Sequence, residues 1–253
     1  MIFTLEQQAL EILNEVSAVI TNSHVVYASG KHGSAYVNKD AIYPHTLATS
    51  RLCGMIAQLF FEEEPEVVVA PAIGGVILSQ WVAYNLTDIR ARAGVDHLEV
   101  LGVYAEHEEK SLLKLDRHEG IMVGDTGRLV FIEAGWELLI KKPSFVIKRG
   151  YDKLVAGRKI LVVEDVLTTG QSAKMVVEAV RALGGNVVGL AALCNRGGIT
   201  AEQVGNPPKF VSLVNVKLDA FDEIGCPLCA AGVPINTEVG KGKAFLARQQ
   251  AAK

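Results

Sequence analysis

The segment from Lys159 to Gly185, KILVVEDVLTTGQSAKMVVEAVRALGG, contains the residues most suited to chemistry in this chain. Ile160 to Val163 form an unbroken apolar run rich in β-branched residues, which predicts a strand buried on both faces of a parallel sheet. Two carboxylates, Glu164 and Asp165, come where that strand is expected to end. They could accept hydrogen bonds from sugar hydroxyls or hold a metal ion.

A polar loop and an amphipathic helix follow the two acids. The loop consists of Thr168, Thr169, Gly170, Gln171 and Ser172. Apolar residues then recur at helical spacing, and two glycines end the pattern. Free amides, hydroxyls and the helix dipole at such a point favour a phosphate, although a Ser or Thr there is more commonly only a helix cap. A phosphorylated sugar would use both the acids and the loop.

The string VVEDVLTTGQS resembles the phosphoribosyl-pyrophosphate (PRPP) signature of type I phosphoribosyltransferases. That signature consists of a hydrophobic strand, two acids and a Thr/Gly/Ser loop. The Walker pattern GxxxxGK[ST] and the Rossmann pattern GxGxxG are both absent from the chain, so neither common nucleotide loop applies. The resemblance implies that Glu164 and Asp165 hold the ribose, that Asp165 also stabilises positive charge at C1, and that the following loop binds the 5′-phosphate.

A second glycine-containing turn follows the apolar run VVVA. Glycine lets a diphosphate approach the main chain closely, and a helix beginning there would add its dipole. The alternative is a plain turn between a strand and a helix. The resemblance implies that the residues of this turn bind pyrophosphate: Ala72, Ile73, Gly74 and Gly75.

The segment SGKHGSAYVNKD, beginning at Ser29, resembles the N-terminal substrate loop of orotate phosphoribosyltransferases. It is dense in hydrogen-bond donors, although solvated loops often have the same composition. The resemblance implies contacts to the base from five of its residues: Ser29, Gly30, Lys31, His32 and Tyr36.

Arg196 follows the apolar run VVGLAAL. A guanidinium binds a planar carboxylate in bidentate fashion, although Arg196 could also be a surface residue that supports a turn. The orotate enzymes have an Asp-Arg pair at this point, and their Arg contacts the carboxylate of orotate. This chain keeps the Arg and replaces the Asp with Asn195.

A basic segment around Lys148 departs from the family pattern. The orotate enzymes have an Arg-Lys pair here, then a long mobile loop whose Lys reaches the neighbouring subunit's site. The resemblance implies pyrophosphate contacts from Lys148 and Arg149 and a catalytic role for Lys153. The loop is short, however, and the His-Gly that normally follows the lysine is missing. A non-catalytic PRPP-binding regulator on the same fold therefore stays open as an alternative.

The resemblance extends from about Ile20 to Phe210 and implies transfer of ribose 5-phosphate from PRPP to a nitrogenous base. Orotate is the expected base because Arg196 would otherwise lack a carboxylate partner, and a purine is the alternative. Mg²⁺ would be held mainly by PRPP itself, without a protein metal site, and a homodimer is implied. The expected fold is α/β, with a mostly parallel central sheet flanked by helices.

The pattern along the chain predicts a single domain over residues 1–253. It has an N-terminal accessory region over about 1–45 and an insertion over about 105–142 with a hairpin around 124–127. Helices are predicted over 5–20, over 47–61 and from Gly75 to about Leu86, and the tail after Gly240 is expected to be frayed. Further strands are predicted over 67–70, 100–104, 145–148, 187–193 and 210–214.

Composition excludes several classes of protein. The chain has 253 residues, is 49% hydrophobic and has a net charge of −3, which argues against a large nucleic-acid surface. No apolar run approaches the ~18 residues needed to span a bilayer, and acids stand where a signal peptide would have basic residues. We expect a soluble, cytoplasmic protein that binds neither nucleic acid nor membrane.

The four cysteines fall into two groups. Cys53 and Cys194 lie in apolar segments and are expected to be buried thiols. Cys226 and Cys229 form a CxxC, a spacing that serves zinc or redox chemistry. Because no second ligand pair of similar spacing is visible, a packed loop with two reduced thiols is favoured, and a zinc protein stays open as an alternative.

Overall fold

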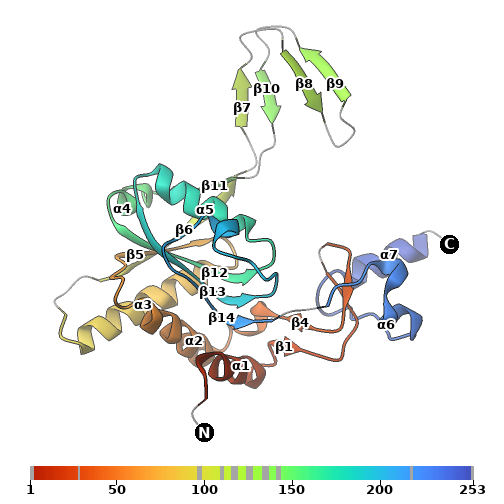
Figure 1. Cartoon of the computed structure of the whole chain (residues 1–253), viewed down its shortest axis with the longest axis horizontal. Helices are drawn as coiled ribbons and strands as arrows, with labels where there is room; N and C mark the ends of the chain where they lie inside the picture. The colour runs from red at the N-terminus through yellow and green to blue at the C-terminus, as the bar shows by residue number, and fades with distance from the viewer. Residues whose placement is uncertain are drawn as a thin grey trace.

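The computed structural model describes residues 3–27, 29–95, 99–108, 111–114, 119–123, 128–132, 137–140, 144–216 and 219–251; within 109–143 it describes only the strands, without side chains. A six-stranded sheet of order β11-β6-β5-β12-β13-β14 forms the centre (Figure 1). Its strands, in that order, are Ser144–Val146, Leu101–Glu108, Val67–Pro71, Lys159–Leu167, Asn186–Asn195 and Phe210–Asn215. The edge strand β11 is antiparallel to β6, and the other neighbours are parallel.

The strand order reverses between β5 and β12, which is the topological switch point of this sheet. From β5 the chain proceeds outward to β6, and later it re-enters beside β5 with β12 and proceeds the other way to β13 and β14. The loops that follow β5 and β12 therefore diverge and leave a crevice at the carboxyl ends of these strands. Ligands of open α/β sheets bind in such a crevice.

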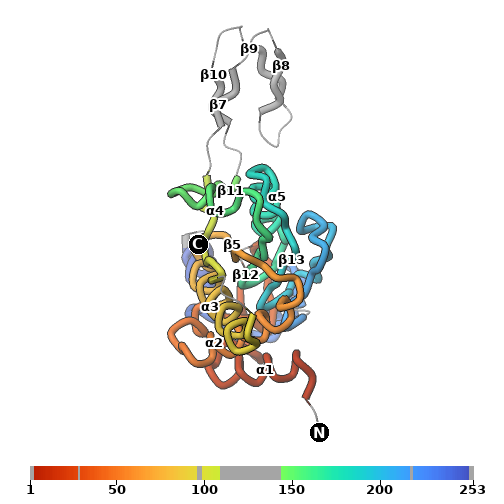
Figure 2. The backbone as a smooth tube through the Cα atoms, turned by 90° about the vertical axis from the view of Figure 1, so that its left-hand side faces the viewer, coloured from red at the N-terminus to blue at the C-terminus, as the bar shows by residue number. Residues whose placement is uncertain are grey.

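Helices cover both faces of the sheet, as the sequence predicts. Helices α1 (Leu5–Glu15), α2 (Thr46–Leu59) and α3 (Val76–Arg92) lie on one side, and α5 (Gln171–Ala182) lies on the other (Figures 1 and 2). Successive residues of β5 alternate between the two cores: Val68 and Ala70 belong to the first, Val67 and Val69 to the second. This alternation explains why β5 has no polar position.

Several predicted boundaries differ from the structure by a few residues, and three of them affect how the elements connect. The first helix ends at Glu15 because Ser17 adopts a φ of 55°, and Val19–Ile20 then form β1, which pairs with β4 (Tyr36–Val37). Helix α3 continues beyond Leu86, since the Thr87 hydroxyl bonds back to Ala83 within the helix. Strand β6 continues to Glu108, so the first four residues assigned to the insertion belong to the sheet.

Within the insertion, two antiparallel ladders are described. Strands β8 (Glu119–Val123) and β9 (Arg128–Ile132) pair as the predicted hairpin requires, and the turn around 124–127 lies outside the described residues. Strands β7 (Ser111–Lys114) and β10 (Glu137–Ile140) form the second ladder.

The two ends of the chain form a unit of short elements beside the sheet (Figure 1). Its N-terminal part contains the ladder of β2 (Val25–Val26) with β3 (His32–Gly33) and a 3₁₀ turn, η1 (Lys39–Ala41). Its C-terminal part contains η3 (Glu223–Gly225), α6 (Pro227–Ala230) and α7 (Gly242–Ala251). The prediction of a frayed tail is wrong, because the buried Phe245 of α7 anchors it to the His32 ring.

The remaining elements are α4 (Asp152–Val155), before β12, and η2 (Glu202–Val204), between β13 and β14. Among the residues described, no helix is both long and apolar enough to cross a membrane.

Candidate functional site

The turn after β5 packs directly onto the acids of β12 at the switch point. A Cβ on Gly74 would lie 2.1 Å from Asp165 Oδ2 and 2.6 Å from Lys39 Nζ. No side chain fits at this distance, so the close approach explains why residue 74 is glycine. Two segments that the sequence singled out separately, the 72–75 turn and the acid pair, thus form one site.

Glu164 and Asp165 lie inside β12, which continues to Leu167, so the prediction that the strand ends before them is wrong. Both are buried, at 7% and 6% exposure. The Val166 amide donates to Asp165 Oδ1 at 2.6 Å, and the Asp165 amide donates to Glu164 Oε1 at 3.2 Å. Burial, and then the charge of Asp165, raise the pKa of Glu164 well above its usual range.

Lys39 supplies the positive charge that partly compensates these acids. Its ammonium lies 2.9 Å from Asp165 Oδ2. Burial lowers the pKa of Lys39, but the carboxylates of Asp165 and Asp40 together outweigh burial and the net shift is upward. The lysine therefore stays charged, and its ammonium lies beside the turn at Gly74.

The predicted phosphate loop joins β12 to α5. Gly170 adopts a φ of 72° and precedes the first residue of α5, Gln171. A left-handed residue at this point turns the chain into the twelve-residue helix, whose first amides have no acceptor within the helix. The first of them, of Gln171, donates to Thr169 Oγ1 at 3.4 Å. Thr168, Thr169 and Ser172 are exposed beside these amides. Amides and hydroxyls on an open helix start are suited to binding a phosphate.

Arg196 lies against this loop from the end of β13. Its Nε donates to Thr168 Oγ1 at 2.9 Å, and its guanidinium carbon lies 5.8 Å and 5.6 Å from the ring centroids of Tyr27 and Tyr36. Two aromatic rings at cation–π distance hold the planar group in place. The structure therefore brings together Tyr36 and Arg196, two of the predicted base-binding residues.

Asn195, where the orotate enzymes have Asp, closes the loop that follows β13. Its side-chain amide donates to the Ile199 carbonyl and accepts from the Ile199 amide, both at 2.9 Å. An ionised aspartate could make only the second of these bonds, because it has no donor. The substitution therefore has a structural role beside Arg196.

A cavity of about 450 Å³ opens next to Arg196. Polar side chains from the N-terminal unit line one part of it, and a C-terminal segment lines the rest. The lining residues are Tyr36, Asn38, Asp40, Arg196, Glu238, Val239, Gly240 and Lys241. The C-terminal contribution was not predicted, because nothing in local sequence links residues 238–241 to Arg196.

The rest of the predicted base loop lies at the tip of the β2–β3 hairpin. Ser29 and Gly30 are exposed there, and Lys31 forms an ion pair with Asp222 at 3.5 Å. His32, by contrast, is fully buried, and its Nδ1 lies 2.9 Å from His24 Nε2. Its ring faces inward, so we do not retain His32 as a base ligand.

The basic residues after β11 are paired with β6. Lys148 Nζ lies 2.7 Å from Glu108 Oε1, and Arg149 forms an ion pair with Glu106. Lys153 lies on α4. Lys148 and Arg149 could therefore contact pyrophosphate, as predicted, only if they released Glu108 and Glu106.

Besides the cavity-lining residues Asn38, Asp40 and 238–241, three residues near the site were missed from the sequence: Tyr27, Lys39 and Tyr43. Tyr43 has a buried hydroxyl without a hydrogen-bond partner in the described part of the chain, and burial followed by the charge of Asp165 raises its pKa. Lys39 lies within the SGKHGSAYVNKD motif, which was available as a signal. Tyr27 had no such signal beyond its closeness to Ser29 in sequence.

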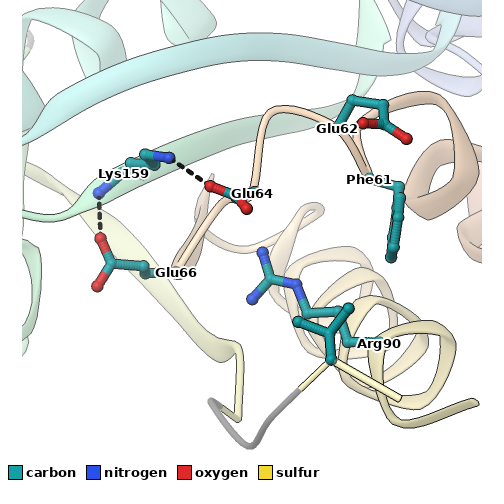
Figure 3. A pocket seen from close by; sticks show the side chains of 7 residues that line it. Phe61, Glu62, Glu64, Glu66, Arg90 and Lys159 are labelled. Atoms are coloured by element: carbon teal, nitrogen blue, oxygen red, sulfur yellow. Dashed lines mark hydrogen bonds and ion pairs between the residues drawn. The ribbon is translucent and has the colours of Figure 1, made fainter. Parts of the chain in front are cut away.

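A second cavity, of about 280 Å³, lies at the opposite, amino ends of β5 and β12 (Figure 3). Its two basic groups have partners: Lys159 Nζ lies 2.8 Å from Glu64 Oε2, and Arg90 donates to the Pro65 carbonyl at 3.0 Å. These bonds tie the start of β12, and also α3, to the segment before β5. The basic groups of this cavity thus have structural partners, and the candidate site is at the other end of the sheet.

Comparison with known proteins gives one family match over part of the chain and relatives that cover most of it. The phosphoribosyl transferase domain family matches residues 132–223. The orotate phosphoribosyltransferase of Thermotoga maritima is 30% identical over 92% of this chain and 97% of its own length. That of Caldanaerobacter subterraneus subsp. tengcongensis is 29% identical over 91% and 95%.

Solved structures show the same fold. The orotate phosphoribosyltransferase of Mycobacterium tuberculosis superposes with a TM-score of 0.51 at 19% identity, covering 84% of this chain and 97% of that one. The enzyme from Aeropyrum pernix gives 0.51 at 20% identity, with 82% and 93% covered. In both comparisons the shared fold includes most of the described chain.

Proposed function

The chain belongs to the type I phosphoribosyltransferase family, and we propose that it transfers ribose 5-phosphate from PRPP to orotate, giving orotidine 5′-phosphate and pyrophosphate. The observation that carries the proposal is the meeting of three elements at the switch point: the turn at Gly74, the acids of β12 and Arg196 with its loop. The turn suits the diphosphate, the acids suit the ribose, and Arg196 suits a carboxylated base.

The reaction breaks the bond between C1 of the ribose and the diphosphate oxygen. A ring nitrogen of the base loses its proton to water or to the leaving diphosphate and forms the new bond to C1. Positive charge develops on the ribose as the diphosphate leaves with the electron pair. Asp165, buried beside Gly74, is placed to hold the ribose hydroxyls and to stabilise that charge. The Ala72 and Gly75 amides of the turn donate to the Ala105 and Pro71 carbonyls, so the Ile73 and Gly74 amides and the Lys39 ammonium would hold the leaving diphosphate.

Mg²⁺ fits this donor set. It prefers oxygen ligands and retains water, so the diphosphate would supply most of its ligands, with Asp165 as the nearest protein carboxylate. When bound, the ion would neutralise part of the diphosphate charge. Lys39 and the backbone amides remain the contribution of this chain to the same task.

Arg196 would select the base. Its Nε is used by Thr168, which leaves the two terminal nitrogens to bind a carboxylate in bidentate fashion. Tyr36 lines the same cavity and offers an aromatic face to a planar ring. Orotate, a planar pyrimidine with a carboxylate, fits both features, whereas a purine would leave the guanidinium without an anionic partner.

The test is pyrophosphate release from PRPP and Mg²⁺ with the purified chain and a panel of bases. We expect release with orotate and background release with uracil, adenine, guanine and hypoxanthine. If pyrophosphate is released only with a purine, that purine and not orotate is the substrate. If calorimetry shows PRPP binding without release for any base, the chain is a binding protein and the proposed activity is wrong.

We propose that the active form is a homodimer. The exposed apolar residues Ile73, Ile77 and Tyr84, at 90%, 42% and 60% exposure, lie on the turn after β5 and on the helix that follows it. A second copy of this face would cover them and would border the diphosphate turn. Sedimentation of the purified chain tests the assembly.

We also propose a cytoplasmic location. All four cysteines are free, as expected in a reducing compartment. Fractionation of cells with an antibody to the chain should find it in the cytosolic fraction, and recovery from an extracellular or membrane fraction would contradict the proposal.

A further inference from the structure

In the unit formed by the two chain ends, two histidines of the N-terminal part and two cysteines of the C-terminal part form one cluster. His24 precedes β2 and His32 lies in β3, whereas Cys226 precedes α6 and Cys229 lies within it. Their four possible ligand atoms all lie within 4.8 Å of one another. Such a convergence of nitrogen and sulfur atoms from distant parts of a chain is typical of a metal site.

Three sulfur–nitrogen distances fit tetrahedral coordination. Cys226 Sγ and Cys229 Sγ each lie 3.6 Å from His24 Nε2, and Cys229 Sγ lies 3.3 Å from His32 Nδ1. The two ring nitrogens are 2.9 Å apart, and an ion with Zn–N bonds of about 2.0–2.1 Å would separate them to roughly 3.3 Å. A tetrahedral zinc ion with Zn–S of about 2.3 Å and Zn–N of about 2.0–2.1 Å places neighbouring sulfur and nitrogen ligands roughly 3.5 Å apart.

The hydrogen bonding of His24 prepares it as a ligand. Its Nδ1 lies 2.7 Å from the Val233 carbonyl oxygen. A carbonyl oxygen only accepts, so Nδ1 carries the hydrogen and the lone pair of Nε2 points into the cluster. Metal-binding histidines typically donate their other ring N–H to a carbonyl in this way.

We propose that this cluster is a structural Zn²⁺ site with four protein ligands, His24, His32, Cys226 and Cys229. A tetrahedral set of two sulfurs and two nitrogens favours zinc. Two thiolates balance the charge of the ion, which suits a cluster in which Cys226 and both histidines are buried. Four protein ligands leave no open position, so the role is structural rather than catalytic.

The structure supplies the second ligand pair that the sequence did not reveal. His24 directly precedes the first strand of the β2–β3 hairpin, and His32 lies in its second strand, where it pairs with Val26. The spacing between the two histidines therefore reflects the length of this hairpin. The expectation of a packed loop around the cysteines is also wrong, because Pro227–Ala230 form α6. The family match ends at residue 223, before both cysteines.

The ion would join the two ends of the chain. The same hairpin and C-terminal segment are also linked by a pair of backbone hydrogen bonds between His32 and Phe221, both 2.8 Å, and by Phe245, whose ring lies 4.8 Å from that of His32 (Figure 1). The segment continues to Lys241, which lines the cavity beside Arg196. An effect of the metal on base binding rests on the proposed function, whereas the metal site itself does not.

The test is elemental analysis of the full chain, purified after expression with zinc and passed through a desalting column. We expect zinc in stoichiometric amount in the parent and in Cys53→Ala, which removes a buried thiol outside the cluster. Cys229→Ser should lose most of the metal, and because Cys229 is exposed the change should not prevent folding. Chelation of the parent should lower its thermal midpoint.

A second measurement uses the unmodified chain. Reduced, metal-free protein titrated with Co²⁺ should develop the intense visible and thiolate-to-metal bands of a tetrahedral site with two sulfurs, saturating at one equivalent. Absence of both zinc and a cobalt spectrum would overturn the proposal, as would equal metal content in Cys229→Ser and the parent. Zinc binding without pyrophosphate release would overturn only the proposed transferase activity.

Discussion

At the scale of single residues, the guanidinium of Arg196 makes one hydrogen bond to Thr168 and lies between two tyrosine rings. We predict that Arg196→Ala lowers kcat/KM for orotate by ~10- to 100-fold, since a hydrogen-bonded charged contact contributes roughly 1.5–3 kcal/mol. Steady-state kinetics of pyrophosphate release would measure this decrease in kcat/KM. Arg196→Lys should recover only part of the loss, because a lysine cannot form the bidentate fork.

Thr168→Val is the matched control for that measurement. It removes the hydroxyl that holds Arg196 but leaves the guanidinium in place. Because Thr168 lies in the phosphate loop, the change should weaken the binding of PRPP more than the binding of orotate. If Arg196→Ala leaves kcat/KM for orotate unchanged, the arginine does not bind the base.

Glu164 gives a prediction on pH and stability. Its pKa is raised in the folded chain, so the folded state keeps a proton that the unfolded state loses above about pH 4.3. Stability should therefore fall as pH rises from that value through the raised folded pKa. Glu164→Gln carries no such proton. Its free energy of unfolding, measured with urea and without ligand, should therefore fall less than that of the parent between about pH 5 and 8.

The control for this prediction is Glu62→Gln, which removes an exposed carboxyl. Its profile should run parallel to that of the parent. Identical slopes for the parent and Glu164→Gln would show that burial of Glu164 does not hold its proton.

At the scale of elements, the turn between β5 and α3 must touch β12 for the site to exist. We predict that Gly74→Ala abolishes PRPP binding measured by calorimetry, because its Cβ would lie 2.1 Å from the Asp165 carboxylate and either the turn or the acid must move. Gly225→Ala, where a Cβ meets nothing within 4 Å, is the matched control and should bind normally. Normal affinity in Gly74→Ala would show that the turn does not hold the diphosphate.

Some elements could be predicted from local sequence, and others depended on distant partners. The run of Ile160 to Val163 and the periodic residues of α5 suffice to predict a buried strand and a helix, because each pattern is local. The continuation of β12 through Glu164 and Asp165 could not be predicted, since their burial depends on Lys39, far away in sequence.

The same limit applied to the cysteines and the tail. Cys226 is 202 positions from His24, and no local pattern links them. Helix α7 has only a weak apolar stripe, so its ordering depends on the contact of Phe245 with His32. By contrast, the turn after β5, the acids and loop of β12 and Arg196 all lie at the carboxyl ends of strands of one sheet, and the order of strands was enough to bring these three motifs together.

At the scale of the whole molecule, the proposed dimer would bury the exposed apolar residues of α3. We predict that the parent sediments as a dimer at micromolar concentration and that Ile77→Asp sediments as a monomer, because the interface would have to bury an unpaired carboxylate. Leu47→Asp, a change of the same type at a residue 81% exposed on α2, should remain a dimer. Circular dichroism of both variants should match the parent, since each side chain lies on the surface. A parent that sediments as a monomer, or an Ile77→Asp variant that assembles as tightly as the parent, would show that this face is not the interface.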